Sequence, residues 1–343
     1  MITKNEFKYG FYGNIVTDCA VRNKDLFIFS ARDEEGSHEH DLTGEWDVVK
    51  YGCMFQKNKD EGKRIGKLTV KGWGRLYCTA CTIPLGKFVC ISAEGCVYTL
   101  GSGENKEEVN ISDSWVNKQA LPDYQGGGPG YFGVWRAKML FGHAWVCGPR
   151  GNVARRVGED KWEYRGNPFP DTMDVYELDN QMFMDIDGFS ENDMYAVGGP
   201  GRVWHYDGQT WSQVAFPTNM HLYAVCCGTD GEVYIGAQSG AVFKGRGSRW
   251  RQIAAGGLAT PFNDMVWFQD RVWATSDNSI WTITDDSMEQ PLIPDEVRVC
   301  AGSMSVGDGV LLVAGQGGAA FHNGVLWQSL FLQHEMTQVV DNP

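Results

Sequence analysis

Gly208-Gln-Thr-Trp211 is the first of three copies of a short pattern in which a tryptophan follows a glycine by three positions. The other two copies are Gly247-Ser-Arg-Trp250 and Gly324-Val-Leu-Trp327. The first two copies lie 39 residues apart and the last two lie 77 apart, which is two nearly equal periods. A fixed period of about 40 residues with glycine and aromatic landmarks is typical of a β-propeller, in which each repeat forms one four-stranded blade.

The segment 182–215 shows what one repeat contains. Four short runs rich in β-branched and aromatic residues are separated by Gly, Asn and Asp, as strands and tight turns require. The same pattern continues along the chain and predicts an all-β fold, a seven-bladed β-propeller of four-stranded antiparallel blades in a single domain of residues 1–343. The predicted blades cover residues 14–73, 74–115, 132–166, 182–215, 221–254, 261–288 and 297–332. Residues 7–12, rich in aromatic side chains, are a candidate cover for the seam between the last blade and the first.

The segment 203–211, with its weaker copies, resembles the YVTN/BNR-like branch of the WD-repeat-like propeller superfamily. The resemblance covers nearly the whole chain as a repeat, and it implies a fold without specifying a function. Trp46-Asp47 lies outside the repeat position, so the chain is not a typical WD-repeat protein. Sialidases carry the pattern Asp-x-Gly-x-x-Trp, and Asp207-Gly208 lacks the intervening residue. A sialidase-like activity is therefore not indicated.

The charge of the chain narrows the classes of partner. With 30 Lys and Arg against 43 Asp and Glu, the formal net charge is −13. Nucleic acids and anionic membranes both select cationic surfaces, so we expect neither as a partner. A protein partner with a basic surface fits the charge, because opposite charges accelerate association. We expect the chain to be a monomer when it is alone.

The compartment is predicted from the first residues and the cysteines. The N-terminus has no apolar run of signal-peptide length, and no stretch reaches the length of a transmembrane helix. Most of the ten cysteines fall in predicted strands, at positions where other blades carry small apolar residues. They are best interpreted as buried thiols and not as a disulfide framework. We therefore predict a cytoplasmic protein.

The four longest insertions should open on one face of the propeller. They are residues 31–46, between the second and third strands of blade 1, and the blade-to-blade connections 115–131, 166–181 and 288–296. Loops on a rigid scaffold commonly carry function, so we place the binding surface on this face.

Two of these insertions contain an acidic segment that has no Lys or Arg. Residues 33–41 have five carboxylates, residues 171–179 have four, and aromatic residues lie among or beside them. Aromatic anchors with flanking charges suit a protein interface. A solvated loop face without a partner is the alternative interpretation. The predicted partner-binding residues are Asp33, Glu34, Glu35, Glu39, Asp41, Trp46, Tyr124, Phe169, Asp171, Asp174, Tyr176, Glu177 and Asp179.

Several smaller patterns could suggest metal, redox or catalytic chemistry. Cys78 and Cys81 lie on a predicted strand, where positions three apart face opposite sides, so they should not share a metal. His38 and His40 are weak metal candidates, because zinc needs further ligands that the sequence does not identify. We expect no metal and no cofactor. A candidate channel pocket comprises Asp18, Asp185, Asp187, His221 and Asp264, whose carboxylates could equally accept backbone hydrogen bonds.

These features together favour binding over catalysis. The chain has no nucleophile elbow, no zinc-protease pattern and no dinucleotide fingerprint in context. We predict a non-catalytic, protein-binding propeller, specifically an immunity or inhibitor protein that neutralises a basic toxin, such as a nuclease, through its acidic face. An assembly or scaffold factor, a lyase or hydrolase that uses the channel His and Asp residues, and a glycan-binding lectin are the alternatives.

Overall fold

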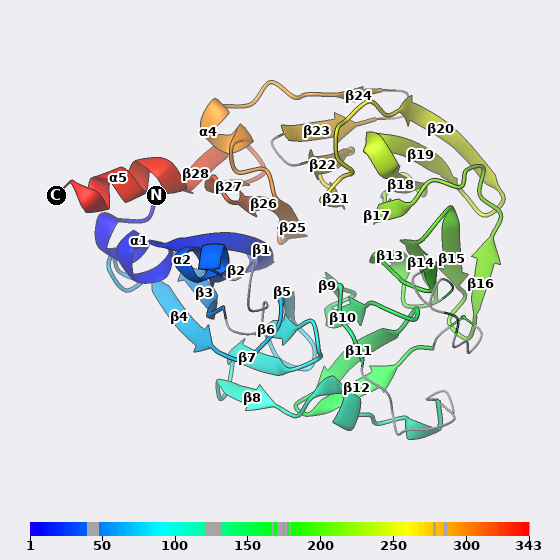
Figure 1. Ribbon diagram of the computed structural model, residues 1–343, viewed down its shortest axis with the longest axis horizontal. Helices are drawn as coiled ribbons and strands as arrows, with labels where there is room; N and C mark the ends of the chain where they lie inside the picture. Colours follow the sequence, from blue (N-terminus) through cyan, green and yellow to red (C-terminus); the bar gives the residue numbers. More distant parts are fainter. Residues whose placement is uncertain are drawn as a thin grey trace.

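Seven four-stranded antiparallel sheets form a ring around a central axis, with the first strand of each sheet innermost and the fourth outermost (Figure 1). The predicted fold class is therefore confirmed: the chain is a seven-bladed β-propeller. The computed structural model describes residues 1–39, 48–120, 132–166, 168–169, 174, 177, 180–276, 279–284 and 287–342.

The strands follow one another in chain order. Blade 1 has β1 (Asn14–Asn23), β2 (Leu26–Asp33), β3 (Lys50–Gln56) and β4 (Ile65–Val70); blade 2 has β5 (Leu76–Cys81), β6 (Lys87–Ser92), β7 (Val97–Gly101) and β8 (Lys106–Glu108). Blade 3 has β9 (Arg136–Leu140), β10 (His143–Cys147), β11 (Val153–Gly158) and β12 (Lys161–Tyr164); blade 4 has β13 (Asp185–Ser190), β14 (Asp193–Gly198), β15 (Arg202–Tyr206) and β16 (Trp211–Val214). Blade 5 has β17 (Leu222–Cys227), β18 (Val233–Ala237), β19 (Ala241–Arg246) and β20 (Arg249–Ala255); blade 6 has β21 (Asp264–Trp267), β22 (Val272–Ser276), β23 (Ser279–Ile283) and β24 (Met288–Glu289). Blade 7 has β25 (Ser303–Gly307), β26 (Val310–Gly315), β27 (Gly318–His322) and β28 (Trp327–Leu332). The α-helices are α1 (Lys4–Gly10), α2 (Glu34–Glu39), α4 (Asp295–Arg298) and α5 (Gln333–Asp341).

The glycine and tryptophan of the repeat have separate physical roles. Gly208 and Gly324 both have φ +94°, in the turn between the third and fourth strands of their blades, where residues with a Cβ are strained. Trp211 and Trp327 are the first residues of the outermost strands β16 and β28. The Trp211 ring packs 5.3 Å from the ring of Phe183, centroid to centroid. The pattern therefore marks a tight turn followed by a packed edge strand.

The apolar core lies between blades. Among the described residues, buried apolar side chains form seven clusters, and each cluster joins two neighbouring sheets. Trp162, fully buried, belongs to the cluster between blades 2 and 3, and Trp145 to the cluster between blades 3 and 4. Burial of this apolar surface is the main favourable contribution to folding, so each blade depends on its neighbours.

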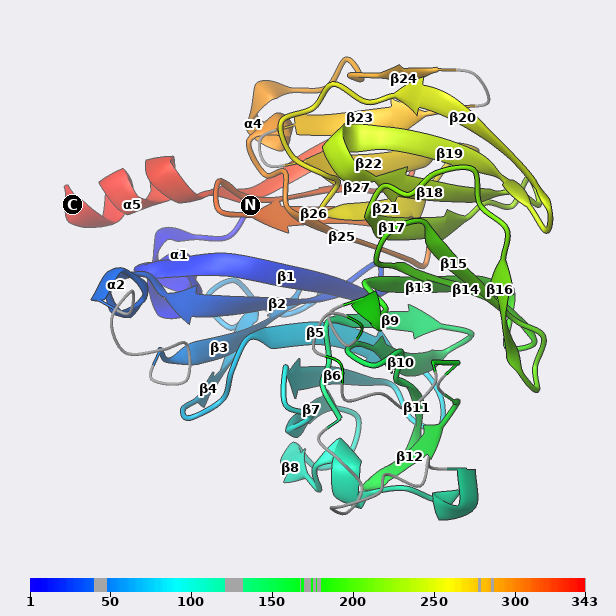
Figure 2. The same cartoon turned by 45° about the vertical axis from the view of Figure 1, so that its right-hand side comes forward.

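Aromatic residues close the ring between blades 7 and 1. The strands of each sheet are consecutive in the chain, so no strand is exchanged across this seam. Phe11, which follows α1, packs 4.4 Å from Phe331 of β28 and 5.5 Å from Phe29 of β2, measured between ring centroids. Helices α1 and α5 lie side by side over the outer part of the seam (Figures 1 and 2). The segment 7–12 thus covers the seam.

Polar contacts fasten α1 to both blades at the seam. The backbone N–H of Ile2 donates to the carbonyl of Leu330 in blade 7 at 3.0 Å. Glu6 is 2% exposed, and its carboxylate accepts from the Arg64 guanidinium at 2.6 Å and from the Gly62 N–H at 2.9 Å, both in blade 1. Burial alone would raise the pKa of Glu6, but the hydrogen bonds from Arg64 and the backbone lower it to about 2. The carboxylate is therefore charged and paired at neutral pH.

We expect Phe11→Ala to destabilise the whole propeller, because it removes the ring at the centre of the closing cluster. Truncation of a buried Phe typically costs about 3–5 kcal/mol in the free energy of unfolding. Urea unfolding followed by tryptophan fluorescence measures the change. Val325→Ala, at a side chain that is 83% exposed, is the control and should stay within about 0.5 kcal/mol of the parent chain. A loss below about 1 kcal/mol for Phe11→Ala would show that the aromatic cluster is not essential to closure.

Candidate functional site

Helix α2 lies in the insertion between the second and third strands of blade 1. Asp33, the last residue of β2, accepts a hydrogen bond from the Gly36 N–H at 2.7 Å and so supports the first turn of this helix. Glu34 and Glu35 occupy that turn, where carboxylates interact favourably with the helix dipole. Glu35 is exposed and Glu34 is half-buried. The helix therefore presents negative charge from the insertion of blade 1.

The connection from blade 3 to blade 4 carries the second acidic insertion. Asp174 and Glu177 are exposed. Phe169 is only 8% exposed, and its ring packs 5.1 Å from Trp204 and 5.6 Å from Phe183. Phe169 therefore contributes to the core between blades 3 and 4, and it is not placed as a surface anchor.

Other predicted partner-binding residues fall where the structure gives no side-chain description. Glu39 and the metal candidate His38 are described only as part of the α2 helix. The remaining predicted residues lie outside the described residues; they are Asp41, Trp46, Tyr124, Asp171, Tyr176, Asp179 and the second metal candidate, His40.

The described part of the chain contains histidines, cysteines and carboxylates that metal or thiol chemistry could use. Within it, no three His, Cys, Asp or Glu side chains are arranged to hold a metal ion. Cys78 packs in the core between blades 1 and 2, whereas Cys81 packs between blades 2 and 3, so their thiols diverge as strand alternation predicts. All ten cysteines are free thiols, and burial raises the pKa of Cys53 and Cys90 to about 12. Such thiols are poor nucleophiles at neutral pH.

The four channel carboxylates accept hydrogen bonds from the backbone of neighbouring blades. In each, one carboxylate oxygen accepts the N–H of the next residue in the chain, and the other accepts an N–H from the innermost strand of the following blade. We call these contacts carboxylate clasps. The inter-blade contacts are Asp18 with Cys78 at 2.9 Å, Asp185 with Val225 at 2.9 Å, Asp187 with Cys227 at 2.8 Å and Asp264 with Met304 at 3.0 Å.

The clasps satisfy backbone N–H groups at the inner edge of the blades. The innermost strand of a sheet has an edge that faces the channel, and its N–H groups there need acceptors. The clasps supply acceptors between blades 1 and 2, twice between blades 4 and 5, and between blades 6 and 7. Of the two interpretations of these carboxylates, the geometry favours backbone binding.

Two cationic side chains of β9 lie close to the clasp carboxylates. The Lys138 ammonium lies 2.8 Å from the Asp185 carboxylate. The Arg136 guanidinium lies 3.4 Å from Asp185 and 3.6 Å from Asp264, and it donates to the Asn263 carbonyl at 2.8 Å. Burial would lower the pKa of both cations, but the surrounding carboxylates raise it above the ordinary value. Both side chains are therefore charged at neutral pH.

The channel contains two cavities that share Asp18 and Arg136 in their linings. One has a volume of about 300 Å³ and is also lined by Asp187 and Asp264; the other, of about 350 Å³, opens at the opposite end. His221 is exposed, and it is absent from the residues that line either cavity. The structure thus brings the predicted carboxylates together but leaves the predicted imidazole apart from them, so an acid–base pair is not assembled.

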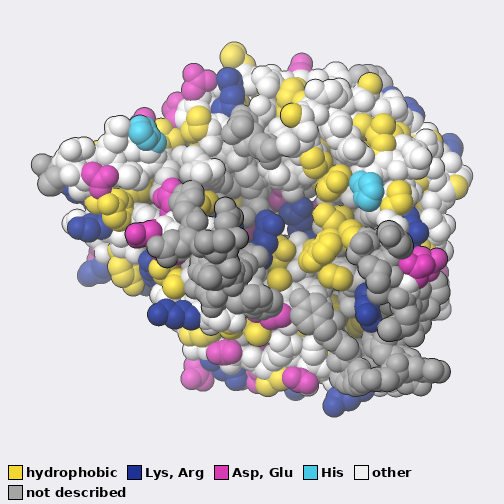
Figure 3. Space-filling model, in the orientation of Figure 1, with side chains coloured by type: hydrophobic (Ala, Val, Ile, Leu, Met, Phe, Trp, Pro, Cys, Tyr) yellow, Lys and Arg dark blue, Asp and Glu magenta, His cyan; other side chains and the backbone are white. Residues whose placement is uncertain are grey.

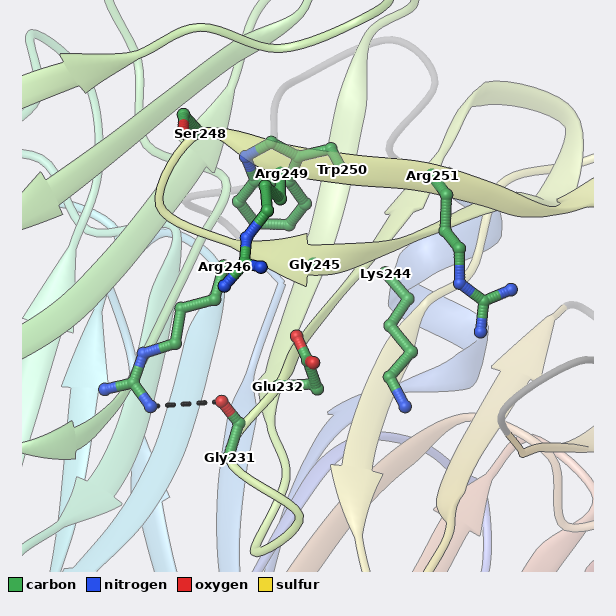
Figure 4. A pocket seen from close by; sticks show the side chains of 9 residues that line it. All are labelled: Gly231, Glu232, Lys244, Gly245, Arg246, Ser248, Arg249, Trp250 and Arg251. Carbon is green, nitrogen blue, oxygen red and sulfur yellow. Dashed lines mark hydrogen bonds between the residues drawn. The ribbon is translucent and has the colours of Figure 1, made fainter.

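A basic hollow of about 880 Å³ lies on the rim of blade 5 (Figure 4). Its lining includes Arg246, Arg249 and Arg251 around Glu232. Arg246 donates to the Gly231 carbonyl at 3.0 Å. This hollow is not among the sites predicted from the sequence, although the alternating cations of Arg249-Trp-Arg251 could have indicated it.

One relative is an immunity protein. The chain is similar to the protein named immune protein Tsi7 of Pseudomonas aeruginosa, with 27% identity over 297 residues, which is 85% of this chain and 89% of the relative. No protein-family model matches the sequence. Within the described residues, no helix has both the length and the apolar character needed to cross a membrane.

Solved structures support the fold. The YCF48 structure with bound D1 peptide superposes with a TM-score of 0.56 at 11% identity, over 90% of this chain and 91% of that one. The WD40 propeller domain of Doa1 gives a TM-score of 0.54 at 11% identity, over 89% and 91%. Sqt1 of Saccharomyces cerevisiae gives 0.55 at 10% identity, over 94% and 86%. These likenesses agree with the resemblance to propeller repeats inferred from the sequence.

We expect the stability conferred by Asp187 to depend on pH. Burial raises the pKa of this carboxyl to about 6 from 3.8, and Lys138 and the clasp oppose the shift only in part. The folded chain therefore holds a proton that the unfolded chain releases. The resulting stability is complete below about pH 4 and is lost as the pH rises through 6, by up to about 3 kcal/mol.

Comparison of Asp187→Asn with the parent chain tests this, by urea unfolding at pH 4, 5, 6 and 7. The stability of the parent chain should fall relative to that of the variant between pH 4 and 6, and the difference should be constant above about pH 7. Asp270→Asn, at an exposed turn, is the control and should follow the parent chain at each pH. A constant difference between Asp187→Asn and the parent chain would contradict the raised pKa.

Proposed function

We propose that this chain is an immunity protein, a non-catalytic propeller that binds a toxin and neutralises it. The observation that carries this proposal is the similarity to immune protein Tsi7, which extends over 85% of the chain. The prediction from the sequence, made from charge, absent catalytic patterns and loop placement, agrees with that similarity. Because an immunity protein acts by binding, its natural partner is a protein.

The channel geometry supports a non-catalytic role. Each carboxylate clasp uses both oxygens of its Asp to hold backbone N–H groups, and His221 lies away from the cavities. The lyase or hydrolase alternative requires His221 and the channel carboxylates to act together on a substrate, and the structure leaves them apart. The assembly-factor alternative has a propeller likeness to YCF48 at 11% identity, which extends to the fold alone.

We infer that the toxin has a basic surface and docks on the face that carries the insertions. Exposed carboxylates of two separate insertions support this inference: Glu35 belongs to helix α2 in the first, and Asp174 and Glu177 belong to the second. The net charge of −13 adds a long-range attraction for a cationic protein. The ten free thiols fit a reducing cytoplasm, where the chain would act as a monomer that pairs with its toxin.

Neutralising the acidic insertions should slow toxin binding. The test variant combines Glu34→Gln, Glu35→Gln, Asp174→Asn and Glu177→Gln. Its association rate should fall about tenfold at low salt, and the difference should shrink near 0.5 M salt, because salt screens exposed charges. A partner captured from the source organism and shown to arrest growth when expressed alone provides the toxin, and biolayer interferometry measures the rates.

The control variant removes the same number and kind of charges from the other side of the molecule. It combines Asp60→Asn, Glu61→Gln, Glu104→Gln and Glu107→Gln, at exposed positions in the turns between third and fourth strands and on β8. It should keep the parent association rate within a factor of about two. Equal losses in both variants would point to net charge and not to the insertion-bearing face. Capture of a partner whose expression is harmless would contradict the immunity function itself.

A further inference from the structure

Basic side chains gather where the central channel opens on the insertion-bearing face. Arg32 lies near the end of β2, Lys50 begins β3, Arg75 precedes β5 and Arg136 begins β9. In antiparallel blades with the first strand innermost, all four positions lie on the insertion-bearing face of the ring. We call these four residues the cationic mouth. Figure 3 views this face and shows Lys and Arg atoms in the hollow at its centre. A chain with a net charge of −13 thus has a basic centre on its proposed binding face.

The residues of the cationic mouth line two adjoining cavities. The outer cavity, of about 290 Å³, is lined by Thr17, Arg32, Lys50, Arg75 and Leu76, so the residues described there include three cations and no carboxylate. The channel cavity of about 350 Å³ shares Thr17 and Arg75 with it.

The channel cavity adds aromatic and polar walls, including Trp135, Tyr223 and Asn263. The carboxylate that lines it, Asp18, already accepts two backbone N–H groups. The pair of cavities is therefore large enough for a side chain. The Lys50 ammonium donates to the Trp73 carbonyl at 2.8 Å, so the donors considered for a ligand are those of the arginines.

The arginines offer donors to a ligand. The Nε–H of Arg32 is buried and has no hydrogen-bond partner among the described residues, which is costly for a polar group unless a ligand satisfies it. Arg75 is exposed, and its guanidinium lies over the Tyr77 ring at 5.3 Å, a contact that orients it. The planar guanidinium group matches carboxylate and phosphate oxygens in two-point hydrogen bonds. Arg136, by contrast, is already paired with Asp185 and Asp264.

We propose that the cationic mouth is an anion site, and that the group it receives in the complex is a carboxylate side chain of the toxin. The source of the carboxylate rests on the proposed function, whereas the anion site itself rests on the geometry. The face would then carry an acidic rim around a basic centre, and the toxin a basic surface around an acidic projection. Such alternation fixes one docking orientation, because a shifted toxin would place like charges together.

The first experiment tests the anion site without the toxin. Protein labelled with ¹⁵N-arginine is titrated with potassium phosphate and with potassium succinate, against potassium chloride at matched ionic strength. The Nε–Hε signals of Arg32 and Arg75 should shift and saturate with phosphate and succinate but not with chloride. Arg32→Lys and Arg75→Lys assign the signals, and the exposed Arg271, in the turn between β21 and β22, is the internal control. Shifts that match chloride, or that are as large at Arg271, would overturn the site.

The second experiment tests whether the toxin occupies the site. Arg75→Glu should weaken toxin binding at least tenfold, Arg75→Lys less, and the control Arg271→Glu less than twofold. Saturable phosphate shifts with unchanged toxin affinity in Arg75→Glu would overturn the toxin as the source of the anion and leave a site for a free anion. Failure to find any toxin would count against the proposed function, while the titration would still decide the anion site.

Discussion

A ring of seven sheets exists only if every neighbouring pair packs, including the pair that the chain does not connect. Here that pair is blades 7 and 1, and each keeps four strands of its own. Closure therefore depends on side chains: the aromatic cluster around Phe11 and Phe331, and the buried Glu6 with its Arg64 partner. The central channel and the loops around it keep their positions only while the ring stays closed in this way.

The sequence predicts the blades well because their determinants are local. A glycine with positive φ and a tryptophan three positions later mark a turn and an edge strand without reference to distant residues. Contacts between blades carry no such local signal. Phe169 was predicted as a surface anchor, yet its ring packs against Trp204, 35 positions away, in the core. The role of Asp187 likewise depends on a backbone N–H, that of Cys227, supplied by the next blade.

The charges of the proposed binding face are likewise predictable from the sequence only where they are local. Acidic insertions are visible in the sequence because their carboxylates are contiguous, as in residues 33–41. The basic centre is not visible, because Arg32, Arg75 and Arg136 come from three blades and are outnumbered by acidic residues overall. A rigid ring lets such unlike charges stand close together without neutralising one another, since the strands and not the charges fix their positions. An immunity protein gains selectivity for one toxin from such a pattern, which net charge alone does not supply.

The carboxylate clasps also make certain backbone amides sensitive to the separation of neighbouring blades. In an ordinary sheet, a backbone amide hydrogen becomes free to exchange with solvent when its strand separates from the strand beside it. The amides of Cys78, Val225, Cys227 and Met304 are instead held by side chains of the preceding blade. Their hydrogen–deuterium exchange therefore follows the separation of whole blades, and the doubly held junction of blades 4 and 5 should be the last of these to open.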